Sequence, residues 1–303
     1  MSTQEAVPAA GARVLVTGAG GRLGGRLAEL LAPRFRVTAG IRASAAPGGL
    51  PAIALDASDA GSVAAALAAT RCTSVVHCAA MADADACERD PDAAARLNEG
   101  ACRTLADACA TRGVRLVALS TDLVLSGERP YWSEDDPALP ASVYGRTKLA
   151  GERAVLEAAE TFAVVRVALV AGRTHGPHPS ATEAIAWALD EGRPLRLFTD
   201  QYRTPVDPES VADALTALVA GGPGGLYHLG GPERLSRFEL GQRVAGVLGL
   251  DPRRIEPVRQ ADHPSGAPRP ADVSLDARRA RDRLGWRPRD VDDAIRAGRP
   301  RRG

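Results

Sequence analysis

The sequence predicts an α/β protein with a doubly wound parallel sheet and a smaller, mostly helical substrate domain on its C-terminal side. Two observations carry this prediction. Short apolar strands alternate with helix-like segments from Arg13 to Val170, a pattern typical of parallel sheets covered by helices on both faces. A glycine-rich turn joins the first strand to the first helix, as dinucleotide-binding folds require.

The alternation breaks after about residue 171 and resumes with a helix near 210–220 and a strand near 225–229. The intervening segment, and the mostly helical region after Pro232, are expected to cover the ligand crevice. The predicted division is a Rossmann domain of residues 12–171 plus about 206–231, a substrate-binding domain of residues 172–205 plus 232–297, and flexible ends at 1–11 and 298–303.

Composition narrows the class of protein. The chain has 303 residues, 45% of them apolar, with a net charge of +1, so it has material for a large core but no strongly basic face for nucleic acid. Without a recognisable leader or a bilayer-length apolar run, we expect a cytoplasmic protein outside the membrane. The five cysteines lack CxxC spacing and are expected to be reduced. His175 and His178 lack a third ligand nearby, so no metal site is expected.

The glycine turn predicts a pyrophosphate site. The strand Arg13–Thr17 runs directly into the turn, and leucines at helical spacing follow it until Pro33. Such a turn lets the backbone approach a pyrophosphate at a helix N-terminus. The residues expected to bind the cofactor here are Gly18, Gly20, Gly21, Arg22, Leu23 and Gly24.

The end of the second strand predicts the form of the cofactor. No acidic residue occurs between Pro33 and Leu55, and Arg42 stands where a ribose-binding acid is usual. An arginine there suits a 2′-phosphate, so NADP(H) is favoured over NAD(H), although Arg42 could simply be solvated. Asp56 either contacts the adenine or caps the following helix. Ala79 and Ala80 are expected to let the backbone lie against the cofactor.

Tyr144 and Lys148 form the predicted catalytic pair. Their four-residue spacing places both on one face of a helix, and Lys148 is the only lysine in a chain with 38 lysine and arginine residues. An ammonium beside a phenol should lower its pKa and make it a usable acid or base. Thr121 ends a buried strand and should face the same crevice, where its hydroxyl can orient a carbonyl.

Asn98 is the only asparagine in the chain and lies inside a predicted helix, Pro91–Arg112. Asparagine is unfavourable in a helix interior, which suggests a polar task such as holding a water molecule or the edge of the sheet near the cofactor. An ordinary surface position is the alternative.

Three motifs together resemble the extended short-chain dehydrogenases/reductases, and within them the dTDP-4-dehydrorhamnose reductase-like subfamily. They are Ser120–Val124, Val143–Glu152 and Arg269–Asp276. The resemblance implies that Tyr144 is the proton donor, that Lys148 binds the nicotinamide ribose, and that Asn98 is the family's helix asparagine. It also implies a nucleotide-sugar substrate and a possible homodimer.

The resemblance further implies contacts to the substrate from Asp122, Arg166, Arg203 and Arg269. Guanidinium groups suit the diphosphate of a nucleotide sugar, although Arg203 or Arg269 could instead hold the two domains together. Leu123 replaces the glutamate of sugar-nucleotide dehydratases, which disfavours dehydration. The rhamnose-forming reductases usually carry an aromatic at this position, so the sequence does not specify dTDP-rhamnose formation itself.

The function expected from these residues is NADPH-dependent reduction of a keto group on a nucleotide-linked sugar or a similar polyol-like metabolite. Two alternatives stay open at this stage. A nucleotide-sugar 4-epimerase would use the same residues but retain NAD between half-reactions. A non-catalytic regulatory subunit would bind NADP and a partner enzyme without turnover.

Overall fold

The computed structural model describes residues 11–262 and 266–299. Its centre is a seven-stranded sheet in the order β3-β2-β1-β4-β5-β6-β9, and every pair of neighbours is parallel. The strands are β1 (Arg13–Thr17), β2 (Arg36–Ile41), β3 (Ala52–Ala54), β4 (Ser74–His77), β5 (Arg115–Thr121), β6 (Ala163–Val167) and β9 (Gly225–Leu229). The predicted doubly wound α/β fold is confirmed, with its reversal of strand order between β1 and β4, where such sheets bind ligands.

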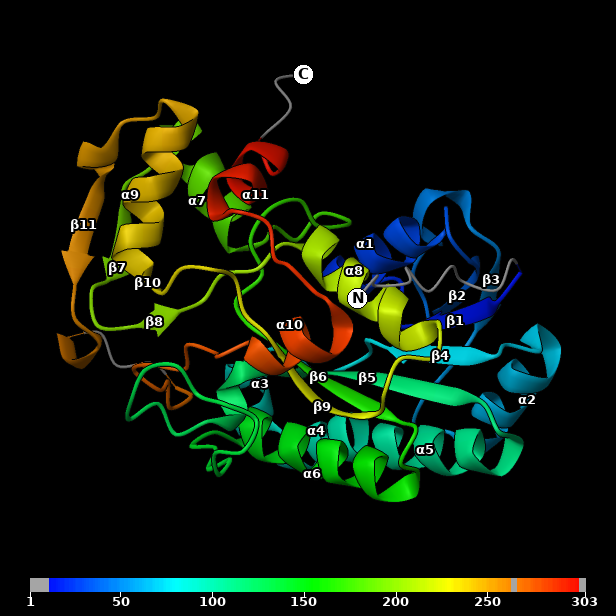
Figure 1. Cartoon of the computed structure of the whole chain (residues 1–303). Helices are drawn as coiled ribbons and strands as arrows, with labels where there is room; N and C mark the ends of the chain where they lie inside the picture. Colours follow the sequence, from blue (N-terminus) through cyan, green and yellow to red (C-terminus); the bar gives the residue numbers. More distant parts are fainter. Residues whose placement is uncertain (1–10, 263–265, 300–303) are drawn as a thin grey trace.

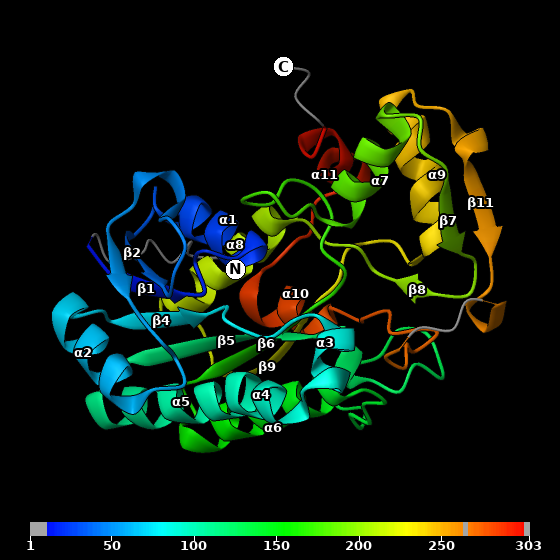
Figure 2. The ribbon, with the colours of Figure 1, turned by 180° about the vertical axis from the view of Figure 1, so that it is seen from behind.

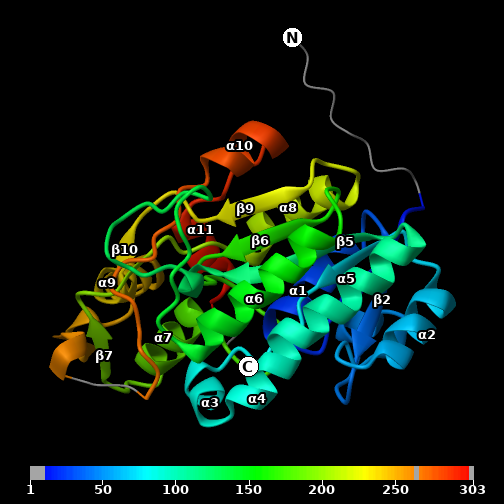
Figure 3. The same ribbon diagram turned by 90° about the horizontal axis from the view of Figure 1, so that it is seen from below.

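Helices cover both faces of this sheet (Figures 1 and 3). One layer contains α1 (Arg22–Leu31) and α8 (Pro208–Val219), and the opposite layer contains α2 (Ala60–Thr70), α4 (Pro91–Ala94), α5 (Ala101–Arg112) and α6 (Val143–Ala158). The short helix α3 (Ala84–Arg89) follows β4 and contacts α6. Because both faces are covered, β4 and β6 are buried along their whole length, and β6 is mostly apolar, as is usual for central parallel strands.

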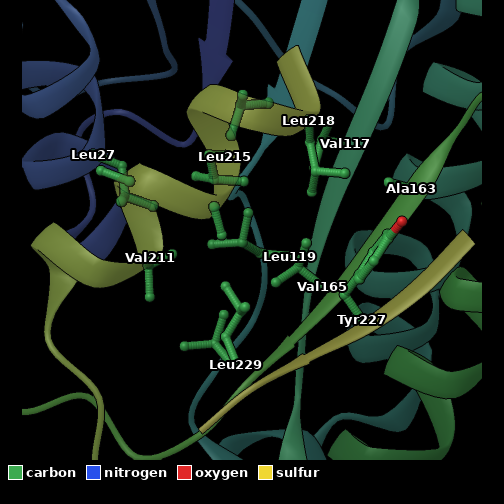
Figure 4. Packing of buried hydrophobic residues seen from close by; sticks show 14 of the residues in the cluster. Leu27, Val117, Leu119, Ala163, Val165, Val211, Leu215, Leu218, Tyr227 and Leu229 are labelled. Atoms are coloured by element: carbon green, nitrogen blue, oxygen red, sulfur yellow. The ribbon is translucent and has the colours of Figure 1, made fainter. Parts of the chain in front are cut away.

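Each face of the sheet has its own apolar core. Figure 4 shows Leu215 and Leu218 of α8 packed against Leu119 and neighbouring residues of the central strands. On the other face, residues of α2 and α5 such as Leu67 and Leu105 pack against the sheet. These two cores hold the carboxyl ends of the central strands in fixed positions.

A third apolar cluster lies beyond the carboxyl end of the sheet (Figures 1 and 2). It joins α7 (Ala181–Asp190), α9 (Arg237–Leu248) and α11 (Val291–Ala297) to the parallel pair β7 (Leu195–Phe198) and β11 (Ile255–Val258). The antiparallel pair β8 (Tyr202–Arg203) and β10 (Leu235–Ser236) lies beside it. That these elements act as a separate substrate domain stays a prediction.

The last part of the chain differs from the expected division, which assigned residues 232–297 to the substrate domain. Helix α10 (Arg278–Leu284) packs against β9 and α8 of the main body. The indole nitrogen of Trp286 donates to the carbonyl of Ser210 in α8 at 2.7 Å. Trp286 and Ala280 belong to the main core, because this part of the chain packs against α8 rather than against α9.

The described residues also bear on membrane spans, metal ligands and thiols. No helix among residues 11–262 and 266–299 is long and apolar enough to cross a membrane, and no cluster of three or more potential ligands in that range could hold a metal ion. The five cysteines are free thiols. Residues 1–10 and 300–303, which make up most of the predicted flexible ends, lie outside the described residues.

Candidate active site and cofactor channel

A cavity of about 640 Å³ opens at the carboxyl ends of the central strands. The glycine turn forms one wall, the end of β5 and the start of α6 form the floor, and residues from β7, β8 and α9 form the opposite wall. A second cavity of about 510 Å³ adjoins it and shares Gly18, Gly21, Cys78 and Ala80. An elongated ligand could therefore extend from one cavity into the other.

The glycine turn has the backbone geometry of a phosphate-binding turn. Gly18 has φ +66°, and a Cβ there would lie 2.6 Å from the Ala79 backbone nitrogen. A Cβ at Gly24 would lie 2.4 Å from the Gly18 carbonyl oxygen. Helix α1 begins after Gly21, and no side chain of the described residues caps it. Its first amide groups are thus available to an anion.

The structure brings all of the predicted cofactor residues to the two cavities. Gly18, Gly21, Arg22, Leu23, Gly24, Ala80 and Lys148 line the first, and Gly18, Gly20, Gly21, Arg42, Asp56, Ala79 and Ala80 line the second. Asp56 does not cap the next helix, because Asp59 accepts from the Ser62 nitrogen at 2.6 Å and takes that role. Asp56 instead accepts from Ser58, which lowers the pKa of its carboxyl group.

The predicted catalytic residues meet on the floor of the first cavity. Thr121 ends β5, while Tyr144 and Lys148 stand one turn apart on α6. The Ser142 hydroxyl caps α6 by accepting from the Gly145 nitrogen at 3.1 Å. All three catalytic candidates are buried in the described structure, so their side chains are accessible mainly through the cavity.

The expected effect of Lys148 on Tyr144 is not what the structure gives. Burial raises the pKa of Tyr144 above its ordinary value and the charge of Asp122 raises it further, whereas the Thr121 hydroxyl and the charge of Arg22 act in the opposite direction. The Lys148 ammonium donates to the Leu119 carbonyl at 2.7 Å, which directs one of its three donors to the backbone. In this state the phenol stays protonated at neutral pH, as a proton donor must.

Asn98 lies in a π-helical turn, Ala95–Gly100, between α4 and α5. Its side chain is fully buried. The side-chain oxygen accepts from the Met81 nitrogen at 2.8 Å, and the side-chain nitrogen donates to the Met81 carbonyl and the Thr147 hydroxyl. Asn98 therefore connects the segment after β4 to α6, next to Lys148. The surface alternative is wrong, and π-turns are frequent at functional sites.

Asp122 and Arg203 form a buried pair on the cavity wall. The Arg203 Nε lies 3.8 Å from Asp122 Oδ2, and this oxygen has no hydrogen-bond partner among the described residues. Burial raises the pKa of Asp122, although the charge of Arg203 opposes the shift. Arg203 also donates to the carbonyls of Tyr202 and Pro270, so it joins two segments of the wall as well as facing the cavity.

Arg269 and Arg166 have different surroundings. Arg269 lines the cavity and pairs with Asp85 of α3 at 3.2 Å. Arg166 is not one of the described residues that line the cavity. Its guanidinium is buried inside the fold and pairs with Glu152 at 2.7 Å. The substrate role expected for Arg166 therefore has no support from its position, because strand β6 directs this side chain towards α6.

Arg237 is a cavity residue that sequence reasoning missed. Burial and the charges of Arg203 and Arg269 lower its pKa to about 10. No acidic group of the described residues forms an ion pair with it, and only the more distant charge of Asp122 favours its charged form. The sequence contains many arginines, and the first residue of a helix carries no signal that would have distinguished this one.

The sequence of this chain is similar to those of known sugar-nucleotide reductases. Residues 12–298 match the family model described as the RmlD substrate binding domain. A dTDP-4-dehydrorhamnose reductase of Streptomyces griseus is 38% identical over 275 residues, which cover 88% of this chain and 86% of the relative.

Solved structures give the same fold. The dTDP-4-dehydrorhamnose reductase of Bacillus anthracis in complex with NADP matches with a TM-score of 0.83 and 24% identity, over 94% of this chain and 97% of the other. MoeE5 in complex with UDP-glucose and NAD matches with a TM-score of 0.80 and 26% identity, over 94% and 97%. The chain belongs to the dTDP-4-dehydrorhamnose reductase-like family of extended short-chain dehydrogenases/reductases and is an NAD(P)-dependent oxidoreductase.

Proposed function

We propose that this protein reduces a keto group on a nucleotide-linked sugar with NADPH, and that Tyr144 is the proton donor. The observation that carries the proposal is the meeting of Thr121, Tyr144 and Lys148 on the floor of one cavity, between the glycine turn and a wall of arginines. Similarity to reductases named for dTDP-4-dehydrorhamnose makes that keto sugar the first substrate to test.

The bound nicotinamide supplies a hydride to the carbonyl carbon. The amide groups at the start of α1 would hold the pyrophosphate of the cofactor. Two donors of the Lys148 ammonium remain beyond its bond to Leu119, and they would bind the ribose hydroxyls. Thr121 would orient the substrate oxygen, and Tyr144 would give that oxygen its proton. The raised pKa of Tyr144 means that the phenol carries its proton in the free protein.

Preference for NADPH is proposed from the second cavity. Arg42 and Ser44 line it, and a guanidinium beside a hydroxyl suits a 2′-phosphate. Asp56, which also lines this cavity, has its carboxyl group engaged by Ser58. It follows the third strand rather than the second, where a ribose-binding acid is usual.

The substrate end is proposed to bind a diphosphate. Arg203, Arg237 and Arg269 all line the first cavity, and Arg237, which forms no ion pair with the described acidic residues, is available to bind an anion there. Asp122 pairs with Arg203 and would orient that guanidinium. We further propose a cytoplasmic homodimer that pairs through α5 and α6, which size-exclusion chromatography with light scattering would test.

The deciding experiment measures oxidation of NADPH and NADH with dTDP-4-dehydrorhamnose, a UDP-linked keto sugar and a free keto sugar. The proposal expects turnover of a nucleotide-linked substrate, faster with NADPH, and its loss in Tyr144→Phe. Interconversion of 4-epimers without net cofactor oxidation would identify an epimerase. Cofactor binding without turnover, unchanged by Tyr144→Phe, would favour the regulatory alternative.

A further inference from the structure

Three successive residues of β5 each meet a residue of α6. The Leu119 carbonyl accepts from Lys148 at 2.7 Å, the Ser120 hydroxyl donates to Glu152 at 2.5 Å, and the Thr121 hydroxyl interacts with Tyr144. Residues 144, 148 and 152 are spaced by four and so share one face of the helix. The end of β5 is thus attached to α6 at three consecutive positions.

Glu152 is itself held in a fixed orientation. Arg166 donates to it through Nε at 3.0 and 3.2 Å and through its terminal nitrogen at 2.7 Å. Another Arg166 nitrogen lies 3.2 Å from His228 Nε2. Because a guanidinium only donates, His228 accepts there, and its Nδ1 donates to the Trp132 carbonyl at 3.0 Å. The network leaves Glu152 as the acceptor for Ser120.

We propose that Glu152 is a positioning residue for this active site, which acts through Ser120 to fix the backbone that carries Thr121. This inference rests on the proposed reductase function and assigns a role outside the Thr–Tyr–Lys set. Neither Ser120 nor Glu152 provides the proton or binds the hydride donor in that mechanism. Their bond fixes the strand end one residue before Thr121.

A positioning role for Glu152 differs from plain stabilisation of the fold. A buried ion pair can often be replaced by well-packed apolar groups without loss of stability. An apolar group at position 152 could not accept a hydrogen bond from Ser120, however, and a small displacement of a group that orients the substrate can cost much of the rate. The bond between Ser120 and Glu152 should therefore affect kcat more than it affects binding.

The test uses Ser120→Ala, Glu152→Met and the double variant, with purified full-length protein. Ser120→Ala removes one hydroxyl and leaves the pair of Glu152 with Arg166 intact, so this variant should fold. We expect kcat to fall roughly tenfold in Ser120→Ala, with the KM for NADPH unchanged. Ser120→Thr, which keeps the hydroxyl, should restore most of the rate. The double variant should be no slower than Glu152→Met alone, because each single substitution already removes the same bond.

Asp292→Asn is the matched control, since Asp292 pairs with Arg243 between α11 and α9, away from the catalytic floor. It should lower the melting temperature without changing kcat. Full kcat in Ser120→Ala, or additive losses in the double variant, would overturn the positioning role while wild-type activity preserves the proposed function. A wild-type protein that reduces none of the keto sugars would overturn both.

Discussion

The side-chain nitrogen of Asn98 donates to the Thr147 hydroxyl at 3.0 Å, and Thr147 directly precedes Lys148. The same side chain bonds to both backbone groups of Met81. One amide therefore links the π-turn, the segment after β4 and the helix of the catalytic pair.

Asn98→Ala should destabilise the fold, because it removes the bonds to Met81 and Thr147 and leaves the Met81 nitrogen without a partner, whereas the Met81 carbonyl still accepts from the Cys87 thiol. Loss of such bonds costs roughly 1 to 3 kcal/mol each, so thermal unfolding should show a melting temperature lower by several degrees. Thr147→Val is the control, since it removes one partner and leaves Asn98 bonded to Met81. Thr147→Val should lower the melting temperature by less than Asn98→Ala does. An unchanged melting temperature in Asn98→Ala would contradict the role of this side chain.

Tyr144→Phe should lower kcat by about 10²-fold or more, which is a typical contribution of a general acid, while NADPH still binds. Because burial raises the pKa of the phenol above its ordinary value, the wild-type enzyme should show no loss of protonated Tyr144 between pH 7 and 9. A kcat profile over that range, together with cofactor titration by fluorescence, measures both effects. Weaker NADPH binding with normal kcat would assign Tyr144 to the cofactor instead.

Arg42→Ala should weaken NADPH binding and leave NADH binding nearly unchanged. A charge-assisted hydrogen bond contributes about 1.5 to 3 kcal/mol, so the ratio of the two dissociation constants should change by roughly 10- to 100-fold. Isothermal titration with both cofactors gives this ratio. Arg103→Ala, on the exposed side of α5, is the control for loss of a positive charge. Equal weakening of both cofactors would exclude a 2′-phosphate contact.

Arg237→Gln should affect binding and stability in opposite directions. The pKa of Arg237 is lowered to about 10, which means that the fold disfavours its charge in the absence of ligand. Removing that charge should raise the melting temperature of the free protein and raise the KM for the nucleotide sugar about tenfold. Thermal unfolding without substrate measures the change in stability, and the shift in melting temperature on adding substrate measures the weaker binding. A lower melting temperature in the free variant would show that Arg237 is already paired.

Stability should fall as the pH decreases below neutrality, because His77 and His228 are buried as neutral groups. Burial lowers the pKa of each to about 3, whereas the unfolded value is near 6.5. Between these limits the unfolded state binds more protons, so stability is fully present above pH 6.5 and declines towards pH 3. The slope is at most about 1.4 kcal/mol per pH unit for each histidine.

Urea unfolding at pH 7.5, 6.5 and 5.5 measures this dependence. His228→Gln should reduce the slope by about half, because Gln does not take up a proton in this range. A wild-type unfolding free energy that is constant from pH 7.5 to 5.5 would contradict the burial of both rings in the neutral form.

Local patterns were sufficient to predict most of the fold and the floor of the site. The strand β9 has the predicted bounds, Gly225–Leu229, and the glycine turn and the spacing of Tyr144 and Lys148 led to the same cavity. These features depend on residues close together in the chain, where periodicity and backbone geometry act directly.

The remaining features depend on contacts between distant residues. Arg166 meets Glu152 only because β6 lies beside β5 and α6 covers both, and nothing in the local sequence reveals that pair. The π-turn around Asn98 and the return of Trp286 to α8 likewise arise from packing. The pKa of Tyr144 was predicted in the wrong direction, because spacing indicates a neighbour but not the degree of burial.

Lys148 gives the chain an unusual chemical property. It is the only lysine in the sequence, and it is 4% exposed on the floor of the cavity. Apart from the α-amino terminus, an amine-directed label has one side chain to modify, and it must pass through the ligand cavity to reach it. The extent of labelling at this position should thus report directly on occupancy of the cavity, without any engineered probe.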